Sequence, residues 1–394
     1  MFLRICLFIT CFLTLSSTGW AQSDESSGEL SQKRSFFDIR NEGGNRYLKV
    51  LDELQSYETE DRMEQSMKSA VMTPIASFMA PNSVYDSLLS RVRHRFRSND
   101  IKKAIEDEGI FDHERVRQEL LERTSGQNLV MFNEHHYYPN HRILVESLLP
   151  RFAEAGFDYL ALETLAPGAD SLLNAGYPLT IESGFYLKDP HFANLIRTAK
   201  SLGFQFVAYE NTDRTMDREE GQAANLYAAT FGRDQSAKVL VLAGVDHILE
   251  VPTQRGKRWL GAVLKEDYDL DPFTINQHHL KYFKDMAEFT ALVESTAFSD
   301  HVLTSVDMHL INNISPNNFG SDFTFKNTYG QRVQVSLFLA DEKSEQFGYN
   351  QLIPYDSHLV DTGEMTSYSL PERDMHLVVY NKEGNVLEER SINR

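Results

Sequence analysis

Four short apolar runs, each followed closely by an ionisable residue, constrain this chain more than any other feature of its sequence. The runs lie at 128–132, 159–162, 205–209 and 238–243, and helical patterns at 143–155, 191–202 and 219–231 separate them. Buried strands that alternate with helices are typical of a parallel sheet covered on both faces. Such sheets carry their sites outside the carboxyl ends of the strands. The residues that follow the four runs therefore predict one shared site: Glu134, Glu163, Glu210 and His247.

The rest of the chain divides into segments of different texture. Residues 1–21 combine a basic start, an apolar run and a Gly-Trp-Ala cleavage pattern, which predicts a secretory signal peptide. Residues 22–45 are rich in Ser, Glu, Gly and Asn, which predicts a flexible lead-in. Residues 46–285 are expected to begin with helices and to form an α/β domain, with a mostly parallel sheet flanked by helices and a fifth strand at 273–276. Residues 286–394 are expected to form a small β-rich appendage with a hairpin turn at 382–385.

Composition restricts the compartment and the partners. Both cysteines, Cys6 and Cys11, lie in the predicted signal peptide, so the mature chain would have no disulfide although we expect export to a periplasmic or extracellular space. The 57 acidic and 39 basic residues give a net charge of −18, which disfavours nucleic acid as a partner. Beyond the signal peptide no run of about 18 uncharged apolar residues predicts a stable membrane span. These features do not specify an oligomeric state.

The residues after the strands suit acid–base chemistry or metal binding. Glu134 and His136 would point to the same side of an extended backbone, because side chains alternate with period two. Glu163 ends a buried strand, where a carboxylate needs solvent, a partner or a metal. If His247 converges on Glu163 and His136, the three form a two-histidine, one-carboxylate set that suits a catalytic zinc, manganese, cobalt or iron ion. The same set without a metal suits general acid–base hydrolysis.

Other residues are predicted to contact the substrate. His141 and Arg142 begin a helix, where Arg142 could bind a carboxylate or phosphate in a bidentate manner or could pair with a surface glutamate. Tyr137 could donate to a substrate, ligate haem iron or belong to a packed aromatic lid. Glu210 could act in the site or cap the loop that follows it. Asp217 is expected to cap the helix that follows it, and Arg218 could face the site.

Together these residues resemble a superfamily that joins erythromycin-esterase-like proteins, ChaN-like haem-uptake lipoproteins and the Tiki/TraB metalloprotease-like group. Its pattern is a Gly-x-x-His after the first strand, a Glu after the second and another Gly-x-x-His after a later strand. The matching positions are Asn133–His136, Glu163 and Gly244–His247, with Asn133 in place of the first glycine. Glu134–His136 and Pro139–His141 are similar to the ChaN-type Glu-x-His and Pro-x-His elements. The likeness covers residues 129–277.

The branches of this superfamily imply different functions. The esterase branch hydrolyses an ester with a His base and Glu residues, the Tiki branch is thought to bind a divalent metal for peptide cleavage, and the ChaN branch binds haem. We therefore expect a hydrolase that cleaves an ester or amide of a small molecule or peptide. His136 would activate water, supported by Glu134 or Glu163, and His247 would be a second acid–base group or a metal ligand. The alternative is a haem- or metal-binding protein without turnover.

Overall fold

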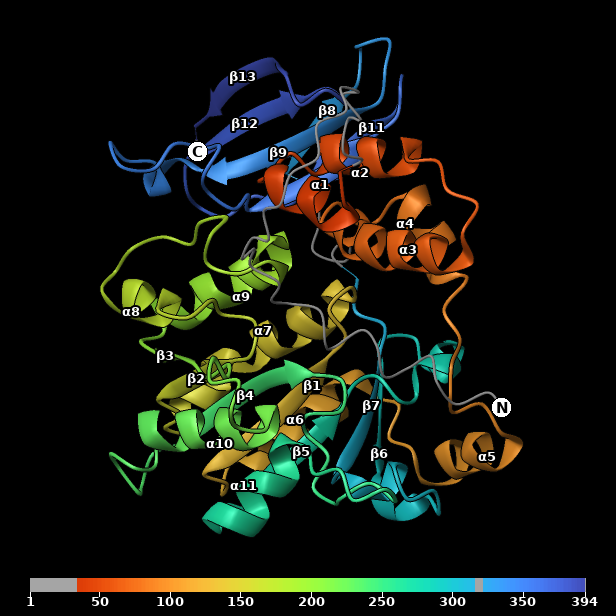
Figure 1. Ribbon diagram of the computed structural model, residues 1–394, viewed down its shortest axis with the longest axis vertical. Coiled ribbons are helices and arrows are strands. Elements are labelled where there is room, and N and C mark those ends of the chain that lie inside the picture. The colour runs from red at the N-terminus through yellow and green to blue at the C-terminus, as the bar shows by residue number, and fades with distance from the viewer. Residues whose placement is uncertain (1–33, 316–321, 394) are drawn as a thin grey trace, which may run out of the picture. The chain divides into compact units, whose positions relative to one another are not determined.

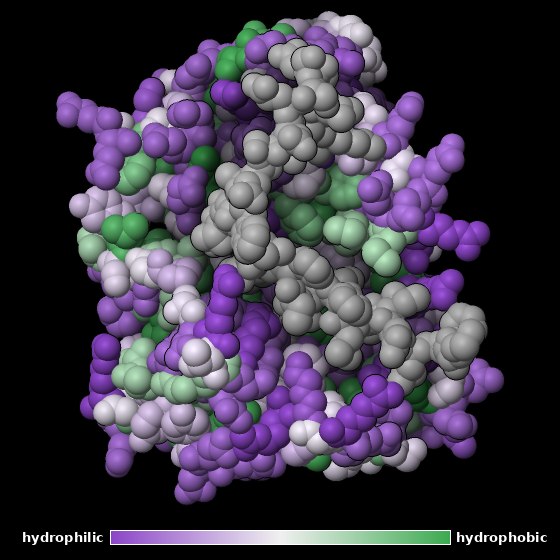
Figure 2. Space-filling view, viewed as in Figure 1, coloured by the Kyte–Doolittle hydropathy of each residue, from purple (hydrophilic) through white to green (hydrophobic). Residues whose placement is uncertain are grey.

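The computed structural model describes residues 34–315 and 322–393. The chain from Phe36 onward belongs to one compact unit. The predicted signal peptide, its two cysteines and residues 22–33 of the predicted lead-in lie outside the described residues. Hydrophilic side chains predominate on the face drawn in Figure 2, with smaller hydrophobic patches between them. Among the described residues, no helix has the length and apolar character needed to cross a membrane.

A seven-stranded sheet forms the centre of the α/β fold, as predicted (Figure 1). Its strand order is β3-β2-β4-β1-β5-β7-β6, and only the pairing of β6 with β7 is antiparallel. The strands are β1 (Leu129–Glu134), β2 (Tyr159–Leu162), β3 (Gln205–Ala208), β4 (Val239–Gly244), β5 (Phe273–Asn276), β6 (Thr290–Glu294) and β7 (Met308–Asn312).

Helices cover both faces of this sheet because its strands are apolar on both sides. Val130 and Phe132 of β1 pack into the core that faces α6 (His113–Thr124), α7 (Pro139–Glu154), α8 (Ala169–Asn174) and α9 (Pro190–Ser201). Leu129 and Met131 pack on the opposite side, against the face covered by α10 (Arg218–Ala229) and α11 (Leu260–Tyr268). Figure 1 shows α10 and α11 together in front of the sheet. This two-sided burial is the reason that the strands have no polar alternation.

The predicted elements of the sheet region are confirmed with small shifts at their ends. β2 and β5 have the predicted bounds, whereas β1 continues to Glu134 and therefore contains the first predicted site residue. α7 begins at Pro139, four residues earlier than expected, because proline fits the first turn of a helix. Gly156 and Gly203 follow α7 and α9 with φ of 85° and 87°, as expected for residues that end helices.

The predicted flexible lead-in is wrong for its last part. Residues 36–42 form a helix, α1 (Phe36–Glu42), whose Phe36 and Ile39 are buried. These side chains pack in a separate hydrophobic core with the helices that follow, which supplies the stability that the local composition does not indicate. The helices between α1 and α6 are α2 (Tyr47–Ser56), α3 (Arg62–Ser77), α4 (Ser83–Leu89) and α5 (Asn99–Glu108).

The predicted domain boundary at residue 285 is also wrong, because β6 and β7 extend the main sheet to Asn312. The β-rich region begins only after them. It has a four-stranded antiparallel sheet of β9 (Val333–Leu339), β10 (Asp356–Val360), β12 (Met375–Tyr380) and β13 (Val386–Ile392). β8 (Phe323–Lys326) pairs with β11 (Met365–Tyr368). The turn between β12 and β13 is the predicted one, and Gly384 has a φ of 82°.

A buried asparagine ties the N-terminal helices to the β-rich region. The Asn45 side chain donates to the backbone carbonyls of Tyr349 and Leu352 at 2.7 and 2.9 Å, and the backbone carbonyl of Asn45 accepts from Gln334 Nε2 at 2.9 Å. Asn45 is only 1% exposed, so water cannot replace these bonds. The two segments are therefore joined by specific hydrogen bonds as well as by apolar contacts.

We predict that Asn45→Ala lowers the free energy of unfolding by about 2–4 kcal/mol, because the buried carbonyl of Leu352 and the half-buried carbonyl of Tyr349 lose their donor. Chemical denaturation monitored by circular dichroism measures this loss. Asn41→Ala, at an exposed position of α1, is the control and should change stability by less than about 0.5 kcal/mol. Equal effects of the two substitutions would contradict the role given to Asn45.

Candidate functional site

The carboxyl ends of β1 to β4 bring the predicted residues together as two networks of charges. The first, called the His136 cluster, follows β1 and consists of Glu134, His136, Arg142 and Asp189. The second, called the Arg218 cluster, lies at the ends of β2, β3 and β4 and consists of Glu163, Glu210, Arg218, Glu219 and His247. Charges that are far apart in sequence thus meet at one edge of the sheet, as predicted for a parallel α/β fold.

In the His136 cluster a buried carboxylate orients an imidazole. Glu134 Oε1 lies 2.6 Å from His136 Nδ1, and Arg142 Nε donates to Glu134 Oε2 at 2.7 Å. Burial opposes ionisation of Glu134, but Arg142 and His136 outweigh it and the pKa of Glu134 falls below its ordinary value. Within the described residues, His136 Nε2 has no hydrogen-bond partner, and the side chain is 27% exposed. The carboxylate therefore favours the Nδ1–H tautomer, which leaves the Nε2 lone pair free to accept a proton.

A tyrosine fixes the plane of the same imidazole. Tyr186 begins the short 3₁₀ helix Tyr186–Lys188, and its ring stacks on that of His136 at 4.0 Å with an interplanar angle of 16°. Burial raises the pKa of Tyr186 to about 12, so its phenol stays neutral. The stack and the bond to Glu134 together restrict the rotation of His136.

Two residues predicted to contact the substrate are instead interior. Arg142 is 0% exposed, and its guanidinium is held between the carboxylates of Glu134 and Asp189. It has no exposed surface with which to bind a substrate anion, so its role is to position Glu134. His141 is also 0% exposed, and its Nδ1 accepts a hydrogen bond from the His135 backbone N–H at 3.1 Å. Both face inward because the first turn of α7 packs beneath the end of β1.

The Arg218 cluster is built around one guanidinium. Arg218 Nη2 donates to Glu163 Oε1 at 2.6 Å and to Glu210 Oε2 at 2.5 Å, and its Nε donates to Glu210 Oε1 at 2.9 Å. Its Nη1 lies 3.1 Å from His247 Nε2. Glu210, predicted to contact the substrate, thus holds Arg218 in place. Asp217 caps α10 by accepting from the backbone N–H groups of the two residues after Arg218, as predicted.

His247 is buried between two carboxylates. Its Nδ1 lies 2.7 Å from Glu219 Oε2 and its Nε2 lies 3.3 Å from Glu163 Oε1. Burial lowers the pKa of His247, but Glu163 and Glu219 outweigh it and the net shift is upward. For Glu163 burial again opposes ionisation, and His247, Arg218 and His136 overcome it to lower the pKa to about 2. The cluster therefore keeps Glu163 ionised and favours a protonated His247.

Gly244 is the point at which the two clusters meet. Its backbone N–H donates to Glu163 Oε2 at 2.5 Å. A Cβ atom at this position would lie 2.9 Å from Glu163 Oε2 and 3.3 Å from His136 Nε2. Glycine therefore creates the space in which the exposed nitrogen of His136 faces the buried carboxylate of Glu163.

The proposed metal ligands do not form a vacant coordination set. Within the described parts of the chain, no group of three or more His, Cys, Asp or Glu side chains is arranged to hold a metal ion. Both oxygens of Glu163 already accept hydrogen bonds, from Arg218 and Gly244. A metal bound by His136, Glu163 and His247 would have to displace the Arg218 guanidinium. Binding of a divalent metal, or of haem through Tyr137, stays a prediction from the resemblance.

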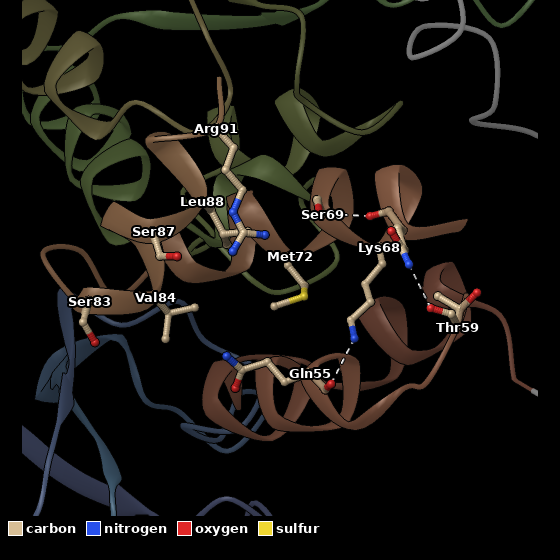
Figure 3. Close-up of a pocket in the computed structure, with 11 residues that line it drawn as sticks. Gln55, Thr59, Lys68, Ser69, Met72, Ser83, Val84, Ser87, Leu88 and Arg91 are labelled. Atoms are coloured by element: carbon tan, nitrogen blue, oxygen red, sulfur yellow. Dashed lines mark hydrogen bonds between the residues drawn. The ribbon is translucent and has the colours of Figure 1, made fainter. Parts of the chain in front are cut away.

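One described cavity lies away from these clusters. It has a volume of about 530 Å³ and lies between α2, α3 and α4, where Gln55, Lys68, Met72 and Arg91 are among its lining residues (Figure 3). Lys68 donates to the carbonyl of Gln55 at 2.9 Å, so its charge is partly satisfied within the helices. None of the lining residues belongs to the His136 or Arg218 cluster. The charge networks, and not this cavity, mark the candidate site.

Sequence reasoning missed several members of the two clusters. Asp189 and Tyr186 precede α9 and belong to no recognisable sequence motif. Glu219 was assigned only to the acidic first turn of α10, which helix capping explains, so its contact with His247 was not predicted. Arg218 was one of the residues expected to face the site, and its position at the start of α10, the helix after the third strand, places it at the carboxyl edge of the sheet.

Comparison with known proteins gives no family. No family model matches the chain, and no curated protein matches it. Two solved structures described as bacterial protein toxins are 14% identical with TM-scores of 0.33, covering 58% and 62% of this chain and 53% and 57% of theirs. The C-terminal region of Pasteurella multocida toxin, described as having a thiol-protease-like catalytic triad, is 15% identical with a TM-score of 0.32, covering 58% of this chain and 33% of that chain. The chain therefore covers between 33% and 57% of the length of these three structures.

We predict that Gly244→Ala destabilises the protein by about 1–3 kcal/mol, because the added methyl group overlaps Glu163 and crowds His136. Thermal or chemical denaturation measures the effect. Gly126→Ala is the matched control, since a Cβ there would meet nothing within 4 Å. A neutral result at Gly244 would mean that the two clusters are not held as described.

We also predict a specific acid sensitivity. The folded pKa of Glu163 is about 2, below its ordinary 4.5, so its ionised form stabilises the fold above about pH 4.5 and that stability is lost as the pH falls toward about 2. At 1.36 kcal/mol per pKa unit the contribution is roughly 3 kcal/mol. Between about pH 5 and pH 2 the wild type should lose more unfolding free energy than Glu163→Gln. The exposed Glu60→Gln variant should follow the wild type, and parallel pH profiles of all three would refute the assignment.

Proposed function

We propose that this protein is an exported hydrolase that cleaves an ester or amide bond by His/Glu acid–base chemistry. The observation that supports this most directly is the geometry of His136. Its Nδ1 is bound to a buried, ionised Glu134, while its Nε2 is accessible at the carboxyl edge of the sheet. A carboxylate that fixes the tautomer of an accessible imidazole is the arrangement of a general base.

In the proposed reaction His136 acts first as base and then as acid. Nε2 takes a proton from a water molecule, and the water oxygen attacks the carbonyl carbon of the substrate. The imidazolium that forms is stabilised by the negative charge of Glu134, which Arg142 holds ionised. When the tetrahedral intermediate collapses, the bond to the leaving oxygen or nitrogen breaks and His136 returns the proton to it.

The Arg218 cluster would act on the charge that develops on the carbonyl oxygen. Arg218 and His247 both contact Glu163, whose carboxylate borders the space at Gly244, and would supply positive charge next to that space. Cationic donors fixed before the reaction stabilise an oxyanion without reorganising. The substrate would be a small molecule or a peptide, and the net charge of −18 disfavours nucleic acid.

The proposal predicts that His136→Ala lowers the turnover number by at least about 100-fold, as does loss of a positioned acid–base group in general. Glu134→Gln should cause a smaller but clear loss, because it weakens the orientation of the imidazole. Hydrolysis of a panel of nitrophenyl esters and fluorogenic peptides by the mature protein measures this.

His376→Ala is the control, because His376 lies in β12 of the β-rich region and pairs there with Glu389. It should retain full activity. Circular dichroism must show that each variant is folded. A folded His136→Ala variant with wild-type turnover would rule out the proposed base, and a wild type that cleaves neither esters nor peptides would rule out the reaction class.

A further inference from the structure

A second group of basic side chains surrounds a tyrosine ring beside the candidate site. It is called the Tyr138 cluster and consists of His135, Tyr138, His141, His278 and Lys281. The Lys281 ammonium lies 3.7 Å from the centre of the Tyr138 ring. The rings of His141, His135 and His278 lie 5.4, 5.5 and 6.2 Å from the same ring, and those of His135 and His278 lie 4.7 Å apart. Since His135 adjoins His136 in the chain, this cluster borders the proposed catalytic group.

The histidines of this cluster have buried ring nitrogens without partners. His135 Nδ1, His141 Nε2 and His278 Nδ1 make no hydrogen bond to any described residue. Because His141 Nδ1 accepts from the His135 backbone N–H, its hydrogen is on Nε2, which is therefore a buried donor without an acceptor. Such groups are costly unless a ligand or water satisfies them.

Lys281 carries the charge of the cluster and is also unpaired. No hydrogen bond or ion pair joins its ammonium to a carboxylate of the described chain, although the protein has a large excess of acidic residues. Burial, with a smaller effect of Lys284, lowers the pKa of Lys281 to about 7. Burial also lowers the pKa of His278 to about 3 and that of His141 well below its ordinary value, so these histidines are neutral donors or acceptors. A cation of this kind gains most from an anionic ligand.

A segment with four arginines at alternate positions contacts the residues next to His278 and Lys281. In the segment 91–97, Arg-Val-Arg-His-Arg-Phe-Arg, the buried Phe96 packs on His279 and the half-buried His94 packs on Tyr282, at ring distances of 5.0 and 5.9 Å. The arginines are exposed, and none forms an ion pair with a described carboxylate: Arg91, Arg93, Arg95 and Arg97. On an acidic protein such a local basic surface attracts anions toward one place.

We propose that the Tyr138 cluster binds an anionic group of the substrate, a carboxylate or a phosphate, with the Lys281 ammonium as counter-charge and the half-buried imidazole of His278, whose Nδ1 has no partner among the described residues, as a neutral donor. That the anion belongs to a substrate rests on the proposed hydrolase function, whereas anion binding itself does not. The cluster takes the role that the sequence suggested for Arg142, whose guanidinium is buried and neutralised.

The test is calorimetric titration of the mature protein with inorganic phosphate and with acetate. We expect the wild type to bind at least one of them, Lys281→Met to bind it at least tenfold more weakly, and Lys284→Met to bind it within twofold of the wild type. Lys284 is the matched control because it is an exposed lysine three residues away. Lys281→Met should fold, since it removes a partly buried charge that has no counter-ion, and its thermal unfolding checks this.

Tighter binding of phosphate would identify a phosphoryl group and tighter binding of acetate a carboxylate, and either supports the site. Absence of binding in the wild type, or equal binding by Lys281→Met, would overturn it. If Lys281→Met does not fold, Lys281→Gln serves in its place.

A pair of matched nitrophenyl esters, one neutral and one with a carboxylate in its acyl group, separates this inference from the proposed function. Lys281→Met should raise KM for the charged ester at least tenfold and leave the neutral ester unchanged. Anion binding without hydrolysis of either ester would contradict the hydrolase function and support the anion site. If the wild type and Lys281→Met hydrolyse both esters with equal kinetics, the hydrolase function is supported and the anion site is contradicted.

Discussion

The parallel pairing of β1 with β4 is the constraint on which the site depends. Its register sets Glu134 opposite Gly244, and the pairing of β2 with the other side of β4 sets Leu162 opposite Leu242, so that the carboxylate of Glu163 reaches the backbone N–H of Gly244. Because strand side chains alternate with period two, a slip of one residue would turn Glu134 to the opposite face of the sheet and separate the His136 cluster from Glu163 and Gly244. Apolar packing on both faces fixes this register, so the core that stabilises the fold also sets the distances between the charged groups.

Buried ion pairs then decide which groups can act. An isolated buried guanidinium is very unfavourable, and Arg142 is tolerated at 0% exposure because two carboxylates and a backbone carbonyl surround it. Lysine could not replace it, since the contacts use several N–H groups of a planar fork. The same logic places Arg218 between Glu163 and Glu210. In both clusters the arginine keeps carboxylates ionised in a region where burial alone would protonate them, and those carboxylates orient the histidines.

The sequence predicts which residues meet at the carboxyl edge of the sheet better than it predicts which of their side chains pair with each other. Runs of apolar residues locate β1 to β5 within two residues, and the residue after each strand lies at the shared edge because chain direction alone requires it. The inward orientation of Arg142 depends on how α7 packs, which no local pattern encodes. β6 and β7 were assigned to the appendage because a strand at the antiparallel edge of a mixed sheet has the same local pattern as one in a separate sheet. α1 was missed because its stability comes from long-range packing of Phe36 and Ile39.

The two sides of the sheet edge differ in whether their charges are satisfied. At the ends of β2 to β4 each cation is paired with carboxylates, and these ion pairs fix the positions of Arg218 and His247. At the end of β1 and beside β5, Lys281 and several histidine nitrogens have no partner in the described chain. A paired charge is held in place, so it can position a neighbour or stabilise charge that develops beside it without moving, whereas an unpaired charge in the same surroundings gains free energy when an anion binds. The satisfied network is therefore suited to chemistry at a fixed point, and the unsatisfied one to recognition.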